Sequence, residues 1–335
     1  MTARYTIVGA GAIGGTLAVH LHHAGVEVQL VDADPEHVAA IREHGLRIEQ
    51  PDSVLTAQLP VFLPEEAPEE LGAVLLAVKA QATDAVAGWI APRLRADGWV
   101  ASMQNGLNEA TIAAHVGPER TVAAFVDLFA DVIGPGVVKD GGIGAIALGE
   151  HAGPVSDRVR ALAHDLRHWG EAIVTDNVEG FLWSKLGFGA MLVATALADD
   201  DMGLLIDRHR PGMHALVREV LAVATAEGKR LESFDAFVPA SYLGSEAEAD
   251  AATDALVAWL ATQTKKRSGI WRDIAVRGRR TEVPTQYQPV VDAGERHGIA
   301  TPLTAWMIDA IVRLETGDAQ MAEAHLDELD RLAAA

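Results

Sequence analysis

The chain contains no cysteine and is short of basic residues. Without a thiol among its 335 residues, disulfide scaffolds, thiolate zinc sites, CxxC redox chemistry and a cysteine nucleophile are all excluded. Lys and Arg number 27 against 47 Asp and Glu, which gives a formal net charge of −20. A chain this acidic needs a local basic patch to bind nucleic acid or an anionic membrane, and the run Arg277-Gly278-Arg279-Arg280 is too small. We therefore expect neither partner.

Several other sequence features are missing as well. No apolar run approaches the ~20 residues that span a bilayer, and the N-terminal residues show no signal-like leader, so we expect a cytoplasmic protein. No serine lies in a G-x-S-x-G motif and no P-loop lysine occurs. His164 and His168 have the i, i+4 spacing of metal ligands, but no third ligand accompanies them. We predict no metal site.

The hydrophobic pattern changes along the chain. In the first half, strands are predicted at residues 5–8, 27–31, 73–78 and 99–103, with helices at 13–24 and 84–94. This alternation predicts an α/β domain with a doubly wound parallel sheet. After about residue 152 only helical patterns follow, at residues 155–169, 179–198, 209–232, 246–266, 286–297, 301–314 and 319–332. We divide the chain into an α/β domain at 1–175 and an all-α domain at 176–335.

The clearest motif is the run Gly9-Ala10-Gly11-Ala12-Ile13-Gly14. It follows a predicted strand and opens a predicted helix, which is the context in which G-x-G-x-x-G binds a dinucleotide. The glycines allow a tight turn, close approach of the pyrophosphate and close helix–strand packing, and the helix N-terminus attracts the phosphate charge. The alternative is a purely structural turn, and the strand-to-helix context favours dinucleotide binding over it.

Asp32 ends the second predicted strand. A carboxylate at that point accepts hydrogen bonds from the adenosine ribose diol and repels a 2′-phosphate. Its alternative role, capping the helix that begins near Pro35, suits Asp34 better. The charge therefore predicts NAD as the preferred cofactor, with NADP as the alternative.

Three more residues are candidates for a site. Asn105 follows a predicted strand at the carboxyl edge of the sheet, where open α/β sheets bind ligands, although Asn-Gly is also a common turn. Lys185 lies in the otherwise apolar helical stretch 181–188, where the alternatives are a catalytic amine and a solvated one. Glu282 would be a surface carboxylate by default. The residues alone leave these alternatives open.

Six short segments, in order along the chain, resemble the 2-dehydropantoate 2-reductase (ketopantoate reductase) family. They are Gly9 to Gly14, Val78-Lys79-Ala80, Gln104-Asn105-Gly106, Pro135-Gly136-Val137-Val138, Trp183-Ser184-Lys185-Leu186 and Arg280-Thr281-Glu282. The resemblance implies a Rossmann domain, a helical domain of the 6-phosphogluconate-dehydrogenase type for substrate binding and dimerisation, and an active site between them. We expect a homodimer.

The resemblance also implies roles for individual residues. Lys185 matches the catalytic lysine, the proton donor, and Glu282 matches the glutamate near the nicotinamide ribose and the substrate. Lys79 and Asn105 match positions that contact the cofactor.

The chain departs from the family pattern where the substrate is bound. The family places asparagines four and eight residues after the lysine, and here these positions hold Gly189 and Val193. The family's substrate-binding serine aligns near Ser268-Gly269, where the alignment favours Gly269 and Ser268 is the adjacent candidate. Arg272 is a candidate clamp for the substrate carboxylate, with a surface ion pair as its alternative. The family also carries an arginine after the second strand, where this chain has Asp32.

These observations predict a nicotinamide-dependent oxidoreductase that interconverts a 2-oxo acid and its 2-hydroxy acid by hydride transfer. Lys185 would stabilise charge on the substrate oxygen and deliver the proton. One alternative is an NAD-dependent dehydrogenase of another hydroxy acid, such as a sugar acid or secondary metabolite. The other is an NAD(H) sensor without turnover, against which the pair Lys185 and Glu282 argues, since a sensor needs no proton donor.

Overall fold

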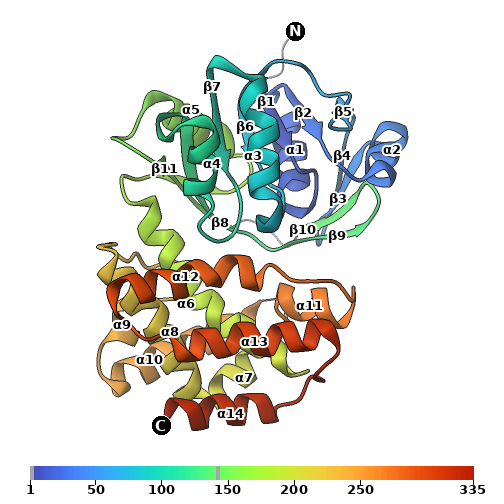
Figure 1. Ribbon diagram of the computed structural model, residues 1–335. Helices are drawn as coiled ribbons and strands as arrows, with labels where there is room; N and C mark the ends of the chain where they lie inside the picture. The colour runs from blue at the N-terminus through green and yellow to red at the C-terminus, as the bar shows by residue number, and fades with distance from the viewer. Residues whose placement is uncertain (1–3, 141–143, 264) are drawn as a thin grey trace. The chain divides into compact units, whose positions relative to one another are not determined.

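The chain divides into two compact units, Met1–Val178 and Glu179–Ala335. The computed structural model describes residues 4–140, 144–263 and 265–335. In this part of the chain every strand lies in the first unit, and the second unit is helical (Figure 1). The predicted fold class, a Rossmann-type sheet followed by an all-α part, is confirmed.

The Gly9 to Gly14 run lies at the carboxyl edge of the main sheet, directly after β1 (Tyr5–Val8). The strand order of this sheet is β12 (Glu171–Val174), β11 (Ala145–Glu150), β8 (Thr121–Asp127), β7 (Leu94–Ser102), β6 (Leu71–Leu76), β1, β2 (Val28–Val31) and β5 (Val61–Phe62). From β8 to β5 all neighbouring strands are parallel, and only β11 pairs antiparallel, with β8. The chain leaves β1 towards β2 and returns to β6 on the other side, so β1 and β6 flank the switch point where such sheets bind ligands.

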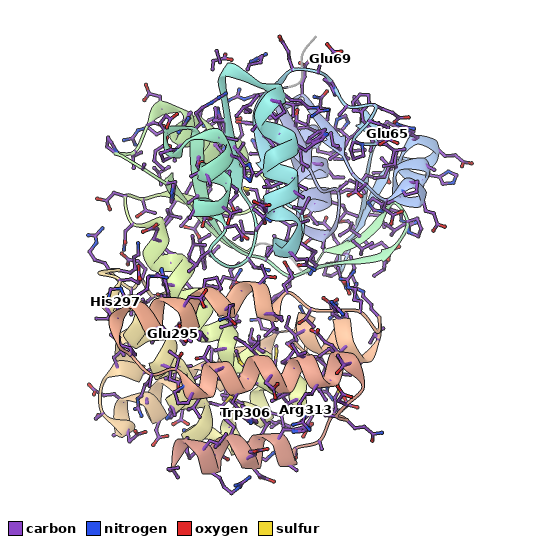
Figure 2. The ribbon with its side chains drawn as sticks, viewed as in Figure 1. Glu65, Glu69, Glu295, His297, Trp306 and Arg313 are labelled. Atoms are coloured by element: carbon purple, nitrogen blue, oxygen red, sulfur yellow. The ribbon has the colours of Figure 1, made fainter. Side chains whose placement is uncertain are left out.

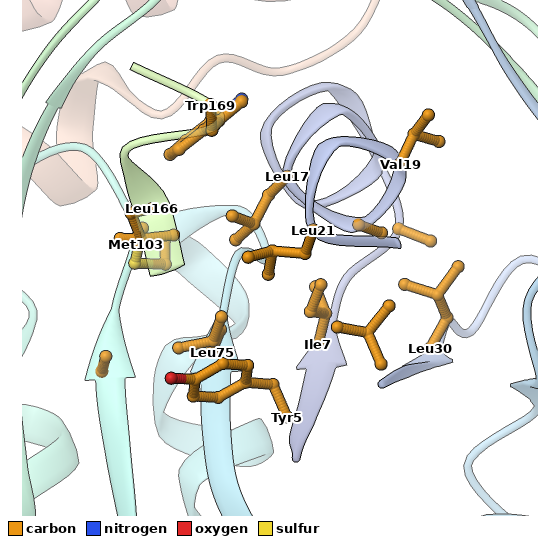
Figure 3. Packing of buried hydrophobic residues seen from close by; sticks show 14 of the residues in the cluster. Tyr5, Ile7, Leu17, Val19, Leu21, Leu30, Leu75, Met103, Leu166 and Trp169 are labelled. Carbon is orange, nitrogen blue, oxygen red and sulfur yellow. The ribbon is translucent and has the colours of Figure 1, made fainter. Parts of the chain in front are cut away.

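Helices cover both faces of this sheet because consecutive strand residues point to opposite sides. Ile7 belongs to one apolar cluster with α1 (Ala12–His23) and α5 (Asp157–Leu166), shown in Figure 3. The next residue, Val8, belongs to a second cluster with α3 (Thr83–Ile90) and α4 (Glu109–Val116). Strand β1 is thus fully buried, which fits its continuous apolar run.

A second sheet lies over α1. It has the order β4 (Val54–Ala57), β3 (Leu46–Glu49), β10 (Val137–Asp140) and β9 (Ala130–Gly134). β3 and β10 are parallel neighbours although about 90 residues separate them, and helix α1 contacts all four strands. Helix α2 (Pro35–His44) precedes β3.

One part of the sequence prediction for the first unit is wrong. Residues after 152 were expected to be helical only, but Glu171–Val174 forms β12, parallel to β11 with α5 as the crossover. Four residues are too few to show strand periodicity, and the strand exists because β11 offers it an edge. Its crossover helix is fixed by the hydroxyl of Tyr5, which donates to Asp165 Oδ2 at 2.7 Å.

The second unit consists of helices α6 to α14. Their bounds are α6 (Val178–Ala194), α7 (Met202–Arg208), α8 (Arg210–Ala226), α9 (Pro239–Leu243), α10 (Glu246–Thr262), α11 (Gly269–Ala275), α12 (Val283–His297), α13 (Pro302–Thr316) and α14 (Ala324–Ala333). The short helices α7, α9 and α11 were not predicted, since one or two turns carry little periodicity. His297, labelled in Figure 2, closes α12, and its Nε2 lies 2.9 Å from Glu227 Oε1.

One helix is long and apolar enough to cross a membrane, contrary to the expectation from the sequence. It runs from Val178 to Leu197, and 78% of its most apolar window is buried inside the protein. Such burial is typical of a core helix. Its aromatic Phe188 packs on Phe237, with ring centroids 5.5 Å apart.

Candidate active site

Two glycines of the G-x-G-x-x-G run are required by close backbone packing. Gly9 has φ +96°, and a Cβ there would lie 2.8 Å from the backbone of Ala77 and Val78. A Cβ on Gly14 would lie 1.9 Å from the carbonyl oxygen of Gly9. The loop between β1 and α1 therefore closes only with glycine at both positions.

The middle glycine, Gly11, has a different environment. An added Cβ would meet no described atom within 4 Å. Gly11 is also the N-cap of α1, where no side chain caps the helix and the first turn holds no acidic residue. The first-turn N–H groups thus lack side-chain acceptors within the described chain, and they form a cradle of the kind that binds a pyrophosphate. The residues present fit a dinucleotide.

Asp32 is hydrogen-bonded to the same loop. Its Oδ2 accepts the Ala10 N–H at 2.7 Å and its Oδ1 accepts the Asp34 N–H at 2.9 Å. Asp34 itself caps α2, as predicted, by accepting from Glu36 and His37. A carboxylate has about four acceptor sites, so Asp32 can still accept from a ribose diol while it holds the loop.

His37 was missed by the sequence reasoning. The buried ring lies on α2, and its Nδ1 accepts the Gly136 N–H at 3.0 Å, from the turn between β9 and β10. Nε2 must then carry the proton, and it donates to the Ala10 carbonyl at 2.9 Å. Asp32 and His37 therefore hold both backbone groups of Ala10. The only local signal was a histidine in the first turn of a predicted helix.

Lys79 and Asn105 follow the ends of β6 and β7, at the same edge of the sheet, and both are exposed. A buried network fixes the two loops that carry them. The Gln104 amide donates to the Val78 carbonyl at 3.0 Å and to Thr83 Oγ1 at 2.8 Å. The Asn108 side-chain oxygen accepts a hydrogen bond from the Thr83 hydroxyl, and its amide nitrogen donates to the Asn105 carbonyl at 2.8 Å.

In the helical unit, Lys185 and Gly189 lie on one stripe of α6. Positions 181, 185, 189 and 192 are half-buried, whereas the residues between them are buried. The spacing of four, four and three residues is that of one helix face. Val193 lies outside this stripe and is 3% exposed, within the core.

Glu282 is the N-cap residue of α12, and it is buried. The residue before it is anchored to α13, because the Thr281 N–H donates to Glu315 Oε1 at 2.8 Å and the Thr281 hydroxyl donates to the same oxygen at 2.5 Å. The Thr281 hydroxyl oxygen also accepts the Val283 N–H at 3.2 Å. Glu315 is a second residue that the sequence did not point to.

Ser268 and Arg272 both belong to the start of α11. Ser268 Oγ accepts the Trp271 N–H at 3.2 Å and caps the helix, so this hydroxyl has a structural role in addition to the predicted substrate contact. Arg272 lies one turn later and is half-buried. No group of His, Asp or Glu that could hold a metal occurs among residues 4–140, 144–263 and 265–335.

The chain is similar to known proteins over most of its length. The family model described as ketopantoate reductase PanE/ApbA matches residues 5–153, and the model of the C-terminal part matches residues 177–315. A 2-dehydropantoate 2-reductase of Lactococcus lactis is 32% identical over 237 residues, covering 68% of this chain and 76% of that protein. The chain belongs to the ketopantoate reductase family.

Two further comparisons extend over nearly the whole chain. A 2-dehydropantoate 2-reductase of Halobacterium salinarum is 29% identical over 323 residues, covering 94% of this chain and 99% of that protein. A D-mandelate dehydrogenase solved in complex with NADH is 25% identical with a TM-score of 0.78, covering 93% of this chain and 99% of that one. The ketopantoate reductase relatives confirm the predicted class: an NAD(P)-dependent oxidoreductase that acts on CH–OH groups and interconverts 2-oxo and 2-hydroxy acids.

Proposed function

We propose that this enzyme prefers NAD(H) and acts on a 2-oxo acid with an apolar group beside the carbonyl, with Lys185 as the proton donor. The observation that carries the proposal is the half-buried stripe of α6, where Lys185 is followed one turn later by Gly189. This face offers one cation and no hydrogen-bonding side chain at position 189.

Lys185 has the chemistry that carbonyl reduction requires. A reduced nicotinamide bound at this site would supply the hydride for the carbonyl carbon, and negative charge would then develop on the substrate oxygen. A positioned ammonium stabilises that charge and transfers its proton to the oxygen. Glu282, buried at the start of α12, orients the lysine or the substrate, and Arg272 and Ser268 bind the substrate carboxylate.

The cofactor half of the proposal rests on the first unit. The N-terminus of α1 around Gly11 holds the pyrophosphate, and Asp32 binds the ribose diol of the adenosine. Lys79 and Asn105 contact other parts of the same cofactor. Asp32 disfavours NADP(H) because its carboxylate would lie beside the 2′-phosphate, and like charges at short range repel. The D-mandelate dehydrogenase relative in its complex with NADH supports this preference.

The substrate half follows from what Gly189 and Val193 lack. Neither side chain donates a hydrogen bond, so a substrate hydroxyl at these positions would remain unpaired at a cost of about 1–3 kcal/mol. Ketopantoate carries such a hydroxyl, whereas mandelate, the substrate in the name of the solved relative, carries a phenyl group. Val193 is buried in the core, so Gly189 alone of the two lies on the half-buried stripe, and an apolar or aryl 2-oxo acid, which needs no hydrogen-bonding partner there, fits this surface better.

Steady-state kinetics with NADH and with NADPH, each combined with a panel of 2-oxo acids, test the proposal. We expect faster oxidation of NADH than of NADPH, and a higher kcat/KM for phenylglyoxylate than for ketopantoate. A kcat/KM for ketopantoate above ~10⁵ M⁻¹ s⁻¹, in the range of good natural substrates, would contradict the substrate assignment. NADH binding without turnover of any acid in either direction would instead support a sensor.

Three further expectations belong to this proposal. Residues 1–175 bind the dinucleotide, residues 176–335 bind the substrate and form a homodimer, and the enzyme is cytoplasmic. Light scattering of the purified chain distinguishes a dimer from a monomer.

A further inference from the structure

Helix α6 contains two glycines with contrasting surroundings. A Cβ on Gly187 would lie 2.8 Å from Leu221 Cδ2 and 3.6 Å from Phe237 Cζ, so this glycine allows close packing against the core. A Cβ on Gly189 would meet a single described atom within 4 Å, the hydroxyl oxygen of Tyr287 at 2.7 Å. Position 189 is therefore open except on the side of one phenol.

Tyr287 connects α12 to the turn of α6 that follows Lys185. Its hydroxyl donates to the Leu186 carbonyl at 2.9 Å, and the side chain is 1% exposed. Burial raises the pKa of the phenol above its ordinary value of 10, so it remains a neutral hydrogen-bond donor. Glu282 is the N-cap residue of the same helix, so one element carries both Glu282 and the contact to Leu186.

We propose that Tyr287 is a positioning and specificity-determining residue, which holds the Lys185 turn of α6 against α12 and excludes any side chain from position 189. The inference rests on the proposed function of Lys185. A Cβ at 2.7 Å from a buried hydroxyl is closer than real Cβ contacts, so a side chain at 189 displaces either the phenol or the helix turn.

This arrangement selects a substrate class. With Tyr287 in place, the half-buried helix one turn beyond Lys185 presents bare backbone, so an apolar group beside the carbonyl carbon would meet no polar side chain of residue 189. An amide at position 189, which would bind a substrate hydroxyl, cannot coexist with the phenol. Glycine at 189 and tyrosine at 287 thus depend on each other, although 98 residues separate them.

The test is a double-mutant comparison of Gly189→Ala and Tyr287→Phe, with Gly187→Ala as the matched control. Steady-state kinetics with NADH use phenylglyoxylate and ketopantoate, and NADH affinity is measured by fluorescence titration. Gly189→Ala should lower kcat for phenylglyoxylate by up to about 100-fold, as expected for a catalytic group displaced by about 1 Å, with NADH affinity unchanged. In the Tyr287→Phe background the same substitution should cost little, because the hydroxyl that it meets is gone.

The ratio of kcat/KM values for two substrates distinguishes a role of Tyr287 in specificity from a purely structural one, because a structural defect would not change this ratio. Gly189→Asn combined with Tyr287→Phe should raise the kcat/KM ratio of ketopantoate to phenylglyoxylate by about 2- to 12-fold, the contribution of one hydrogen bond. Gly187→Ala should lower the unfolding midpoint equally in both backgrounds. If Gly189→Ala does not fold, recovery of folded protein by Tyr287→Phe supports the inference and failure to recover overturns it.

If the effects of Gly189→Ala and Tyr287→Phe on kcat are additive, the inference is overturned while the proposed function stands. The same holds if Gly187→Ala is coupled to Tyr287→Phe as strongly as Gly189→Ala is. If the unaltered chain reduces no 2-oxo acid, the proposed function fails, and the inference fails with it.

Discussion

The two units hold their predicted site residues by different means. In the first unit, hydrogen bonds join the site loops in pairs: half-buried Asp32 holds the loop after β1 to the loop after β2, and buried Gln104 holds the loop after β7 to the loop after β6. In the second unit, the helix that carries Lys185 is fixed mainly by apolar and aromatic packing, with Phe188 against Phe237 on one side and the Tyr287 phenol on the other. On the proposed function, we therefore expect cofactor binding to depend on loop geometry and substrate choice to depend on helix packing.

The strongest test of this contrast is Lys185→Ala in the helical unit. Turnover should fall by about 10²–10⁴-fold while NADH affinity stays nearly unchanged, because the ammonium acts only once charge has moved to the oxygen. Single-turnover kinetics and NADH fluorescence titration measure the two quantities. Lys229→Ala, which removes the cation of the ion pair with Glu179, is the control and should retain activity. Unchanged turnover in Lys185→Ala would remove the lysine from the mechanism.

In the first unit the corresponding test is Gly11→Ala. The added methyl group meets no described atom, so the unfolding midpoint should stay unchanged, whereas NADH affinity should fall by about 10- to 100-fold through loss of backbone contacts to phosphate. Gly134→Ala is the matched control, since its Cβ also meets nothing within 4 Å of the described chain, and it should bind NADH normally. Equal NADH affinity of Gly11→Ala and the unaltered chain would contradict the phosphate cradle.

A smaller effect is expected in the same unit when the charge of Asp32 is removed and the preference between NADH and NADPH is measured. Asp32→Asn keeps an acceptor for the Ala10 N–H but removes the charge, so the ratio of NADPH to NADH affinity should rise by about 10-fold. Asp34→Asn removes a neighbouring charge that caps α2 and should leave the ratio unchanged. Tighter binding of NADPH than of NADH by the unaltered chain would show that Asp32 does not select the cofactor.

The smallest expected effect concerns the stability of the helical unit below neutral pH. Burial lowers the pKa of His214 below its ordinary 6.5, although Glu246 and Asp250 nearby oppose the shift. A lowered pKa means that the stabilisation is present above pH 6.5 and is lost as the pH falls through the folded-state value. Denaturant unfolding should therefore show a loss of stability between pH 7 and 5 to which this group contributes. His214→Gln should flatten that change, and His44→Gln, at an exposed site, should not.

How far the sequence could predict the site also differs between the units. The glycine spacing and the Asp34 cap follow from local backbone geometry, and both appear in the structure as expected. His37 and Tyr287 could not be found this way, because their partners Gly136 and Leu186 lie 99 and 101 residues away. Short elements such as β12 depend on a neighbouring strand, so the sequence shows no periodicity for them. The roles of Lys185 and Glu282 remain predictions.

The hydrogen bond between His37 and Gly136 has a consequence for synthesis of the protein. The Gly9–Gly14 loop and His37 are synthesised well before Gly136, so the brace on the Ala10 carbonyl is completed only 99 residues after His37. At translation rates of about 5–20 residues per second this delay is roughly 5–20 s. During that interval α1 lacks strands β9 and β10, and its apolar surface remains uncovered on that side. A nascent chain stalled before residue 136 is therefore expected to bind chaperones rather than dinucleotide.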